Sequence, residues 1–407
     1  MSDVDIAIVG GGMVGASLAV ALEGLGLRTA LIETIAHDSA SQPSFDERTT
    51  ALSNGSRRIL DTLGVWPRVA AAATPIRKIH VSDQGHFGFA RIDAADQGLE
   101  AMGYVVPNRS LGTALWGSLA SNRALHVYCP AEVLGITPGA DAVTLDVAAG
   151  GERTTVVARL VVAADGSQSA VRSAFGVAAE VRDYDQTAVI TTVLPQRFHD
   201  YVAYERFTQS GPLALLPLAD GRCTLVLTLK PKMAESALSW SDHEFLAEVQ
   251  QRFGFRLGRF LKVGRRVPYP LSLSRASQTS AGRCVIVGNA AQGLHPVAGM
   301  GFNLGLRDVA SLAELVAERV RSGAGDVGHA AMLGQYDAWR AADRGGIITF
   351  TDGLVRLFSS PLSAAQRLRN FGLLAFDVLP PAKAALSRLS TGAAGRVPKL
   401  ARGVPLR

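Results

Sequence analysis

The sequence predicts a mixed α/β fold in which a Rossmann-like domain is joined to a separate mixed β-sheet domain and to C-terminal helices. Residues 4–33 show an apolar run, a glycine turn opening an alanine- and leucine-rich segment, and a second apolar run, the pattern of a βαβ unit. Later segments read as successive strands. With 407 residues, 48% of them hydrophobic, the chain can bury a large core and exceeds a typical single domain. We therefore expect two interleaved domains.

The first glycine turn matches the GxGxxG signature of dinucleotide binding. Gly10, Gly12 and Gly15 follow the first predicted strand, and Glu33 ends the second. In such a unit the first glycine makes the tight turn, the second lets the backbone approach a pyrophosphate, and the third lets the helix pack on the strand. The helix N-terminus faces the phosphates, and the carboxylate accepts hydrogen bonds from a ribose. This context predicts a dinucleotide site, with a purely structural glycine turn as the alternative.

A second GxGxxG match, residues 323–328, has a different context. It follows the helical run SLAELVAERV rather than a strand. By the same criterion we expect a helix end and a loop here. The sequence therefore predicts one dinucleotide fold.

Two further segments place a turn and a helix after a strand. Residues 158–172 form a β-branched run followed by Asp165-Gly166, and residues 283–288 form an apolar run followed by Asn289 and a glycine-rich loop. Taken alone, the first is an ordinary Asp-Gly turn. The second allows close approach of a ligand, and a helix beginning near Gly301 would aim backbone N–H groups at it. Together they favour FAD over a nicotinamide cofactor.

Cysteine and histidine usage argues against disulfides and metals. Cys129, Cys223 and Cys284 are an odd number of cysteines without CxxC spacing, which fits buried thiols in a reducing compartment. The eight histidines show no HxxxH or Cys/His cluster. We expect no metal site.

The two ends of the chain bear on localisation. The N-terminus lacks the basic region of a signal peptide, and no apolar run reaches the roughly 20 residues of a membrane-spanning helix. From Arg356 onward nine Lys or Arg accompany one acidic residue, Asp377, beside apolar stretches such as NFGLLAFDVL and AKAALSRL. This suits an anionic membrane surface or an acidic partner, or equally a solvated helix pair covering the core. We expect a cytoplasmic protein that is peripheral at the inner face of the cytoplasmic membrane.

Three motifs in order carry a family resemblance. They are GxGxxG with Glu33, DGxxSxVR at residues 165–172, and GNAAQGLHPVAGMGFN at residues 288–303. Together they resemble the flavoprotein aromatic hydroxylases of the para-hydroxybenzoate hydroxylase fold, nearly end to end. SFDERTTALSNGSRRIL around Arg48 and YERFTQSGPLALLPL from Tyr204 are similar to the ubiquinone-biosynthesis hydroxylases, in the 2-polyprenyl-6-methoxyphenol hydroxylase branch.

The resemblance implies FAD as cofactor, NAD(P)H as transient co-substrate and O2 as oxidant. In this family NAD(P)H reduces FAD, and the reduced flavin takes O2 to form a C4a-hydroperoxide whose distal oxygen is transferred to a phenol ring. The implied function is hydroxylation of a polyprenylated phenol in ubiquinone biosynthesis. The alternatives are a hydroxylase of a small soluble phenol or secondary metabolite, and a non-catalytic flavoprotein subunit of a biosynthetic complex. The motifs leave open the ring position, NADH or NADPH, the tail length and the oligomeric state.

The resemblance also implies the site residues. His295, Pro296 and Gly299 would lie at the reacting face of the flavin, although a loop histidine bonded to backbone explains His295 equally well. Arg48 and Arg109 match positions that contact FAD or its vicinity, with a surface salt bridge as the alternative. The expected cofactor contacts are Gly10, Gly12, Met13, Val14, Gly15, Glu33, Arg48, Arg109, Asp165, Gly166, Arg172, Gly288, Asn289, Gly299, Gly301, Phe302 and Asn303.

Two positions depart from the family pattern. Asn289 stands where most members have an aspartate that binds the ribityl chain, and Gln292 replaces a common histidine. An amide oxygen accepts the same hydrogen bond without a charge, so we expect FAD to bind less tightly.

The strands and motifs together divide the chain into three parts. The sheet formed by the later predicted strands should cover the isoalloxazine ring of FAD. Candidates for the substrate pocket or, alternatively, for the hydrophobic core are Phe207, Leu215, Leu216 and Pro217. Expected partners are the polyprenyl phenol and other quinone-biosynthesis proteins, not nucleic acid. We expect the FAD-binding domain at residues 1–75, 98–180 and 275–333, the substrate-binding sheet at 76–97 and 181–274, and C-terminal helices at 334–407.

Overall fold

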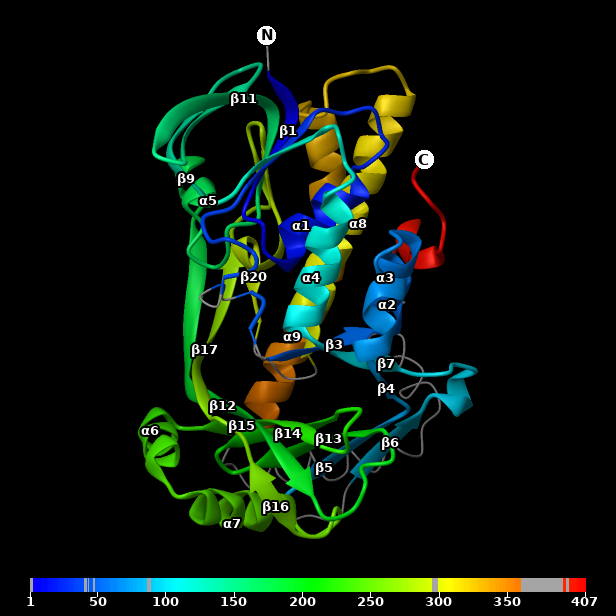
Figure 1. The fold of residues 1–407 in the computed structure, drawn as a ribbon, viewed down its shortest axis with the longest axis vertical. Helices are drawn as coiled ribbons and strands as arrows, with labels where there is room; N and C mark the ends of the chain where they lie inside the picture. The colour runs from blue at the N-terminus through cyan, green and yellow to red at the C-terminus, as the bar shows by residue number, and fades with distance from the viewer. Residues whose placement is uncertain are drawn as a thin grey trace.

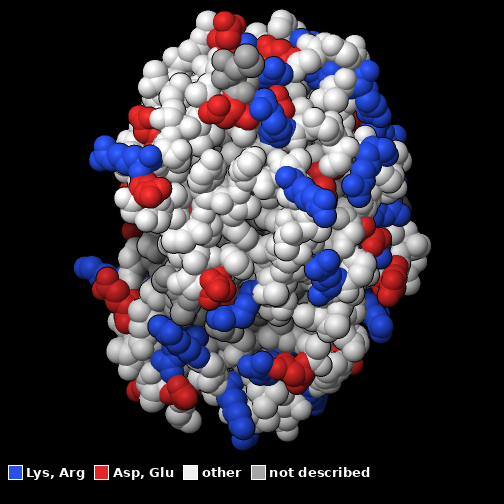
Figure 2. Space-filling model, turned by 45° about the horizontal axis from the view of Figure 1, so that its top comes forward, with Lys and Arg blue, Asp and Glu red and all other residues white. Residues whose placement is uncertain are grey.

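The computed structural model describes residues 3–39, 42, 44–46, 48–85, 89–294, 299–359, 391–392 and 395–407. These residues form three β-sheets, with a layer of helices packed on the first (Figure 1). The mixed α/β fold expected from the sequence is confirmed. On the face seen in Figure 2, basic and acidic side chains are interspersed.

The first sheet contains the predicted βαβ unit. Strand β1 (Val4–Val9) leads through α1 (Met13–Ala21) to β2 (Thr29–Ile32), and the two strands are parallel. The strand order is β18-β19-β11-β1-β2-β8, with β10 and β9 extending antiparallel from β11. All of β1 is buried, as expected for a central parallel strand covered on both faces. The other strands are β8 (Leu125–Tyr128), β9 (Ala131–Pro138), β10 (Val143–Ala149), β11 (Glu152–Ala163), β18 (Ser280–Ala281) and β19 (Cys284–Ile286).

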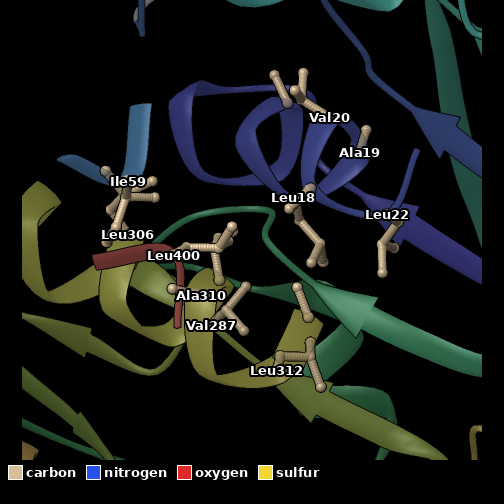
Figure 3. Close-up of a cluster of buried hydrophobic side chains, with 14 of the residues drawn as sticks. Leu18, Ala19, Val20, Leu22, Ile59, Val287, Leu306, Ala310, Leu312 and Leu400 are labelled. Atoms are coloured by element: carbon tan, nitrogen blue, oxygen red, sulfur yellow. The ribbon is translucent and has the colours of Figure 1, made fainter. Parts of the chain in front are cut away.

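The helical layer packs on this sheet through one apolar cluster. Figure 3 shows Leu18 of α1, Val287 at the end of β19, and Leu306 and Leu312 of α8 within it. These four side chains are at most 1% exposed, so they anchor the helices on the sheet. The helices outside the second sheet are α2 (Asn54–Thr62), α3 (Trp66–Val69), α4 (Asn108–Leu119), α5 (Ala170–Ala174), α8 (Met300–Arg321) and α9 (Ala330–Ser359), with 3-10 turns η1 (Ala70–Ala72), η2 (Ala95–Gln97), η3 (Gly288–Ala290) and η5 (Leu400–Arg402). Of these, α5 packs on the opposite face of the first sheet through Val171.

The second sheet is formed by the later segments of the chain that the sequence pattern predicts to be strands. Its order is β20-β17-β12-β15-β14-β13-β5-β6, with β16 also paired to β12. Helices α6 (Pro231–Ser239) and α7 (Asp242–Phe253) cover one face through buried residues such as Phe245 and Val249. The strands are β5 (Lys78–Asp83), β6 (Phe89–Asp93), β12 (Ala179–Pro195), β13 (Val202–Thr208), β14 (Gly211–Pro217), β15 (Cys223–Leu229), β16 (Phe260–Val263), β17 (Val267–Ala276) and β20 (Gln292–Gly293).

Two long antiparallel strands connect the sheets. Strands β12 and β17 pair from Ala179↔Ala276 to Ile190↔Val267, with one irregularity between Asp183 and Gln186. The ends of the two strands at the Ala179↔Ala276 pair lie beside the first sheet, and the ends at the Ile190↔Val267 pair lie within the second sheet (Figure 1). The late glycine-rich loop joins this ladder directly, because β20 pairs with β17.

A small sheet lies between the two larger ones. Its order is β3-β7-β4, from β3 (Thr49–Ser53), β7 (Gly103–Pro107) and β4 (Thr74–Ile76). Thr49 Oγ1 of the small sheet lies 3.0 Å from Thr224 Oγ1 of β15, so a hydrogen bond connects the small sheet to the second sheet.

The C-terminal region is described in part. Helix α8 ends at Arg321, and Gly323 and Gly325 follow with φ of +72° and +65°, so the second GxGxxG match is a helix end and a loop, as predicted. The segments NFGLLAFDVL and AKAALSRL lie outside the described residues. Within the described part of the chain, no helix is long and apolar enough to cross a bilayer.

Candidate cofactor and substrate site

The first glycine turn is closed so tightly that side chains have no room. Gly10 has φ of +104°, and a Cβ on it would lie 2.4 Å from the Ala164 carbonyl oxygen. A Cβ on Gly15 would lie 1.8 Å from the Gly10 carbonyl oxygen. Both positions therefore require glycine, and the turn brings the start of α1 against the carboxyl ends of β1 and β11.

Glu33 supports this turn from the end of β2. One carboxylate oxygen accepts the Gly11 N–H at 2.5 Å, and the other accepts the Ile35 N–H at 2.9 Å. Trp116 of α4 adds a bond that the sequence did not suggest, since its indole N–H donates to the Gly11 carbonyl at 3.0 Å. The predicted ribose carboxylate thus lies beside the glycine turn and also fixes its shape.

Asp165 follows β11 at the same edge of the sheet. Its Oδ2 accepts the Val171 N–H at 3.1 Å, while its buried Oδ1 has no hydrogen-bond partner among the described residues. Buried carboxylate oxygens rarely go without a donor. An external hydroxyl or N–H would satisfy Oδ1, and the adjacent Gly166, with φ of +88°, leaves the backbone open there.

The late loop forms a second tight turn against α1. Gly288 has φ of +57°, and a Cβ on it would lie 2.9 Å from Val14 Cγ2. Its N–H donates to Asp308 Oδ2 at 3.1 Å. The next side chain, Asn289, is exposed, so its amide is available to a ligand.

The start of α8 faces the same region without a side-chain cap. Gly299, at φ of +60°, is the N-cap residue, and none of the described side chains caps the helix there. A Cβ on Gly301 would meet none of the described residues within 4 Å, so their packing does not explain this glycine. An uncapped helix N-terminus presents backbone N–H groups that favour negative charge.

Comparison with known proteins identifies what such a site holds. The chain is 37% identical over 406 residues to the ubiquinone hydroxylase UbiL of Rhodospirillum rubrum, covering 99% of this chain and 93% of that relative. It is 32% identical to the 3-demethoxyubiquinol 3-hydroxylase of Escherichia coli, covering 92% and 94%. Residues 3–348 match the family model described as an FAD binding domain.

The chain belongs to the FAD-dependent hydroxylases of ubiquinone biosynthesis. Solved structures show the same fold. The p-nitrophenol 4-monooxygenase PnpA of Pseudomonas putida superposes with a TM-score of 0.78 at 19% identity, covering 96% of this chain and 98% of that one. The flavin-dependent monooxygenase PieE, solved with FAD and substrate, superposes with a TM-score of 0.70 at 21% identity, covering 97% and 72%.

The observed geometry fits FAD. The glycine turns leave room for a ligand to approach the backbone, Asp165 Oδ1 lacks a donor among the described residues, and Gly301 borders open space. As an FAD-dependent hydroxylase, this enzyme needs an elongated site that runs from a pyrophosphate turn to an aromatic ring system. The two turns and the start of α8 offer such a series of groups.

Two residues predicted to contact the cofactor also make hydrogen bonds within the protein. Arg172 Nη1 donates to the Ala290 and Ser167 carbonyls at 2.7 and 3.2 Å, which joins the Asp165 turn to the Gly288 turn. The Asn303 amide donates to the Ala51 and Gly299 carbonyls at 2.8 and 2.7 Å and accepts the Ser53 N–H at 2.8 Å. Both therefore shape the FAD site from within the protein.

The other residues predicted to lie at the FAD site differ in their contacts and in their exposure to solvent. Arg48 pairs with Asp46 at 2.6 Å and stacks over the Tyr269 ring, and Arg109 is exposed in the first turn of α4. His295 and Pro296 lie outside the described residues. Gly12, Met13, Val14 and Phe302 are partly buried at the N-termini of α1 and α8.

A buried ionic network behind the Gly288 turn was missed by sequence reasoning. Arg340 Nε donates to Asp308 Oδ1 at 2.7 Å, and Asp308 Oδ2 accepts the Gln292 side chain at 2.8 Å. Arg340 also pairs with Asp343, which pairs in turn with Arg307. Gln292 had been noted as a departure from the family, and its contact with Asp308 gives it a structural role.

The residues predicted to line the substrate pocket point to opposite faces of the second sheet, because side chains alternate along a strand. Leu215 is fully buried in the core under α7, so it does not line a site. Leu216, its neighbour, packs on the opposite face with Ala51 of β3 and Ala203 of β13. That opposite face is the one turned toward the start of α8, because a Cβ on Gly299 would lie 3.0 Å from Ala51 Cβ.

Proposed function

We propose that this enzyme hydroxylates the aromatic ring of a polyprenylated phenol in ubiquinone biosynthesis, with NAD(P)H and O2 as co-substrates. The observation that carries the proposal is the 37% identity to a ubiquinone hydroxylase over 99% of the chain. FAD, when bound, supplies the electron transfer and the oxygen activation. The protein must orient the phenol ring and exclude water.

The proposed FAD contacts follow the order of the chain. The turn at Gly10, Gly12 and Gly15 would receive the pyrophosphate, and Glu33 the adenosine ribose. Asp165 Oδ1 and the exposed Asn289 amide supply hydrogen-bonding groups along the crevice between the two turns. The isoalloxazine would lie against the first turn of α8, whose N–H groups stabilise negative charge on a reduced ring.

The substrate ring would bind between α8 and the second sheet. Support comes from the Ala51 contact with Gly299 and from the apolar cluster that Ala203 and Leu216 form with Ala51. His295 and Pro296 remain part of this proposal as residues at the reacting face. We propose residues 76–97 and 181–274 as the substrate-binding domain and the flanking segments as the FAD-binding domain.

We also propose that the enzyme associates peripherally with the cytoplasmic membrane, where a polyprenylated substrate resides. Besides the basic C-terminus, residues 254–265 support this proposal. Phe255 and Leu261 are 67% and 54% exposed. They lie among four exposed cations that form no ion pair with any described residue: Arg256, Arg259, Lys262 and Arg265. Exposed apolar side chains among cations suit an anionic lipid surface.

The decisive test is mass spectrometry of quinone lipids from cells that lack this protein. Loss of ubiquinone, with accumulation of a prenylated phenol one oxygen short, would support the proposal and identify the ring position. The wild-type gene should restore ubiquinone, and a Gly15→Ala gene should not. Unchanged ubiquinone in a cell without a second hydroxylase would contradict the proposal.

Purified protein separates the two alternatives. A small soluble phenol as the true substrate would give full phenol-stimulated NAD(P)H oxidation without lipid. A non-catalytic subunit would hold FAD but show no stimulation by any phenol. Hydroxylation of a short-chain prenylphenol would exclude the second alternative.

A further inference from the structure

Strand β13 presents two different faces. The Tyr204 ring contacts the Phe253 ring of α7 at 5.3 Å, and Arg206 Nε donates to the Arg252 carbonyl at 2.8 Å. Side chains alternate along a strand, so Glu205 must point to the other face. That face is the one turned away from α7.

The face that carries Glu205 meets the start of α8. Ala203, two residues before Glu205, packs with Leu216 and with Ala51, the residue nearest to Gly299. Residues two apart on a strand are about 7 Å apart. Glu205 therefore lies about 7 Å along the sheet from the contact with the proposed substrate site.

Glu205 is the one charged residue in an apolar row. Directly paired residues on neighbouring strands point to the same face, and the row reads Ile190, Val226, Ala214, Glu205, Val81 and Ala90. Among the described residues, no hydrogen-bond donor or cation contacts the Glu205 carboxylate. Among the described side chains on this face, the next row contains the carboxylate of Asp83, which pairs with Phe207.

The Glu205 side chain is partly buried on this face of the sheet. Its burial raises the pKa of the carboxyl to about 7. A carboxylate in apolar surroundings without a described hydrogen-bond donor is costly to maintain, and such groups cluster at functional sites.

We propose that Glu205 is the base that accepts the proton of the substrate's phenol hydroxyl, an inference that rests on the proposed function. The phenol O–H bond breaks, an O–H bond forms on a Glu205 oxygen, and the electron pair stays on the phenolate oxygen. The ring becomes more electron-rich at its ortho and para carbons, where oxygen is to be added. The proton on Glu205 returns to solvent or to the product.

The acidity of the carboxyl suits this role. A phenol has a pKa of about 10, so transfer to an ordinary glutamate with a pKa of about 4.3 is unfavourable by roughly 10⁶-fold. With a pKa of about 7, Glu205 reduces this to roughly 10³-fold while remaining largely ionised just above neutral pH. Burial thus makes a stronger base from a weak one.

The test compares wild type, Glu205→Gln and Glu205→Asp on a short-chain prenylphenol. We expect kcat/KM of the wild type to rise with pH through an apparent pKa near 7, and Glu205→Gln to lose this dependence with a loss of about 10²- to 10⁴-fold. Glu205→Asp should retain the pH dependence at a lower rate. The matched control is Glu180→Gln, at an exposed position of β12.

A series of ring-fluorinated prenylphenols separates base catalysis from a structural role. Fluorine makes the phenol more acidic, so the deficit of Glu205→Gln should shrink along the series. An equal deficit for every phenol, or an unchanged pH profile, would overturn the proposal. If the wild type hydroxylates no prenylphenol, the proposed function itself is wrong. If the wild type is active and Glu205→Gln is equally active, only the role of Glu205 as the base is wrong.

Discussion

Arg340 of α9 and Asp308 of α8 form an ion pair that is almost completely buried, with side chains 0% and 1% exposed and Nε 2.7 Å from Oδ1. The second Asp308 oxygen accepts the Gly288 N–H at 3.1 Å. A single carboxylate therefore connects α9 to the turn that we assign to FAD. Burial of such a pair is tolerable only because both charges are paired and hydrogen-bonded.

Arg340→Ala should destabilise the enzyme by about 3–5 kcal/mol, because it leaves Asp308 charged, buried and unpaired. Urea unfolding of the FAD-loaded protein measures this. The control is Arg321→Ala, an exposed arginine near the end of α8, which should change stability by less than about 0.5 kcal/mol. FAD should also bind less tightly to Arg340→Ala, and equal stability of the two variants would contradict this account.

Gly301→Ala should fold normally and yet bind FAD or turn over poorly. A Cβ at Gly301 or at the exposed Gly334 of α9 meets none of the described residues within 4 Å, so both alanine variants should be as stable as wild type or up to about 1 kcal/mol more stable. Only at Gly301 would the methyl group project toward the proposed isoalloxazine position. FAD titration and turnover of both variants check this, and a fully active Gly301→Ala would exclude close approach of a ligand there.

Glu205→Gln should stabilise the enzyme at high pH. The folded pKa of about 7 lies above the unfolded value of about 4.3, so the folded state binds more protons between these limits and stability falls as pH rises through them. The full cost, about 4 kcal/mol, should be present above pH 7 and absent below about pH 4. Unfolding of both proteins from pH 4 to 8 should show stabilities that agree at the acidic end and diverge toward pH 8; parallel curves would refute the raised pKa.

Replacing Phe255 and Leu261 together by serine should weaken binding to vesicles that contain anionic lipid. Both side chains are more than half exposed, so stability and soluble-phenol turnover should not change. Vesicle sedimentation measures the effect, with Met233→Ser/Leu238→Ser on α6 as the control, since these residues are also exposed. Equal binding by both double variants would locate the membrane contact elsewhere.

The parts of the fold that could be predicted are those encoded by local patterns. The unit from β1 through α1 to β2 follows from glycine spacing within about 30 residues, and the helix end at Gly323 follows from its context. Local patterns could not predict which strands pair when the strands are far apart in the sequence. Strand β5 lies parallel to β13, more than 100 residues later, and only the folded chain reveals this neighbour.

The hydrogen bonds within the candidate site could not be predicted from its motifs. A motif does not show what each residue contacts, so the bonds of Arg172 and Asn303 to backbone carbonyls are found only in the structure, and their contact with FAD stays a prediction. The bond from Trp116 to Gly11 and the pair of Asp308 with Arg340 join segments without a shared motif. Glu205 did leave a signal, as the one carboxylate in strand β13.

The ladder of β12 and β17 has a mechanical consequence. The same two strands run from the Rossmann-like region into the second sheet, and ten register pairs hold them together on the two sides of the irregularity between Asp183 and Gln186. Bending at the paired residues would break backbone hydrogen bonds, so the two ends of the molecule should move largely together. Admission of the proposed polyprenylated substrate should then depend more on local opening of segments that border the ladder than on a clamshell closure of two lobes.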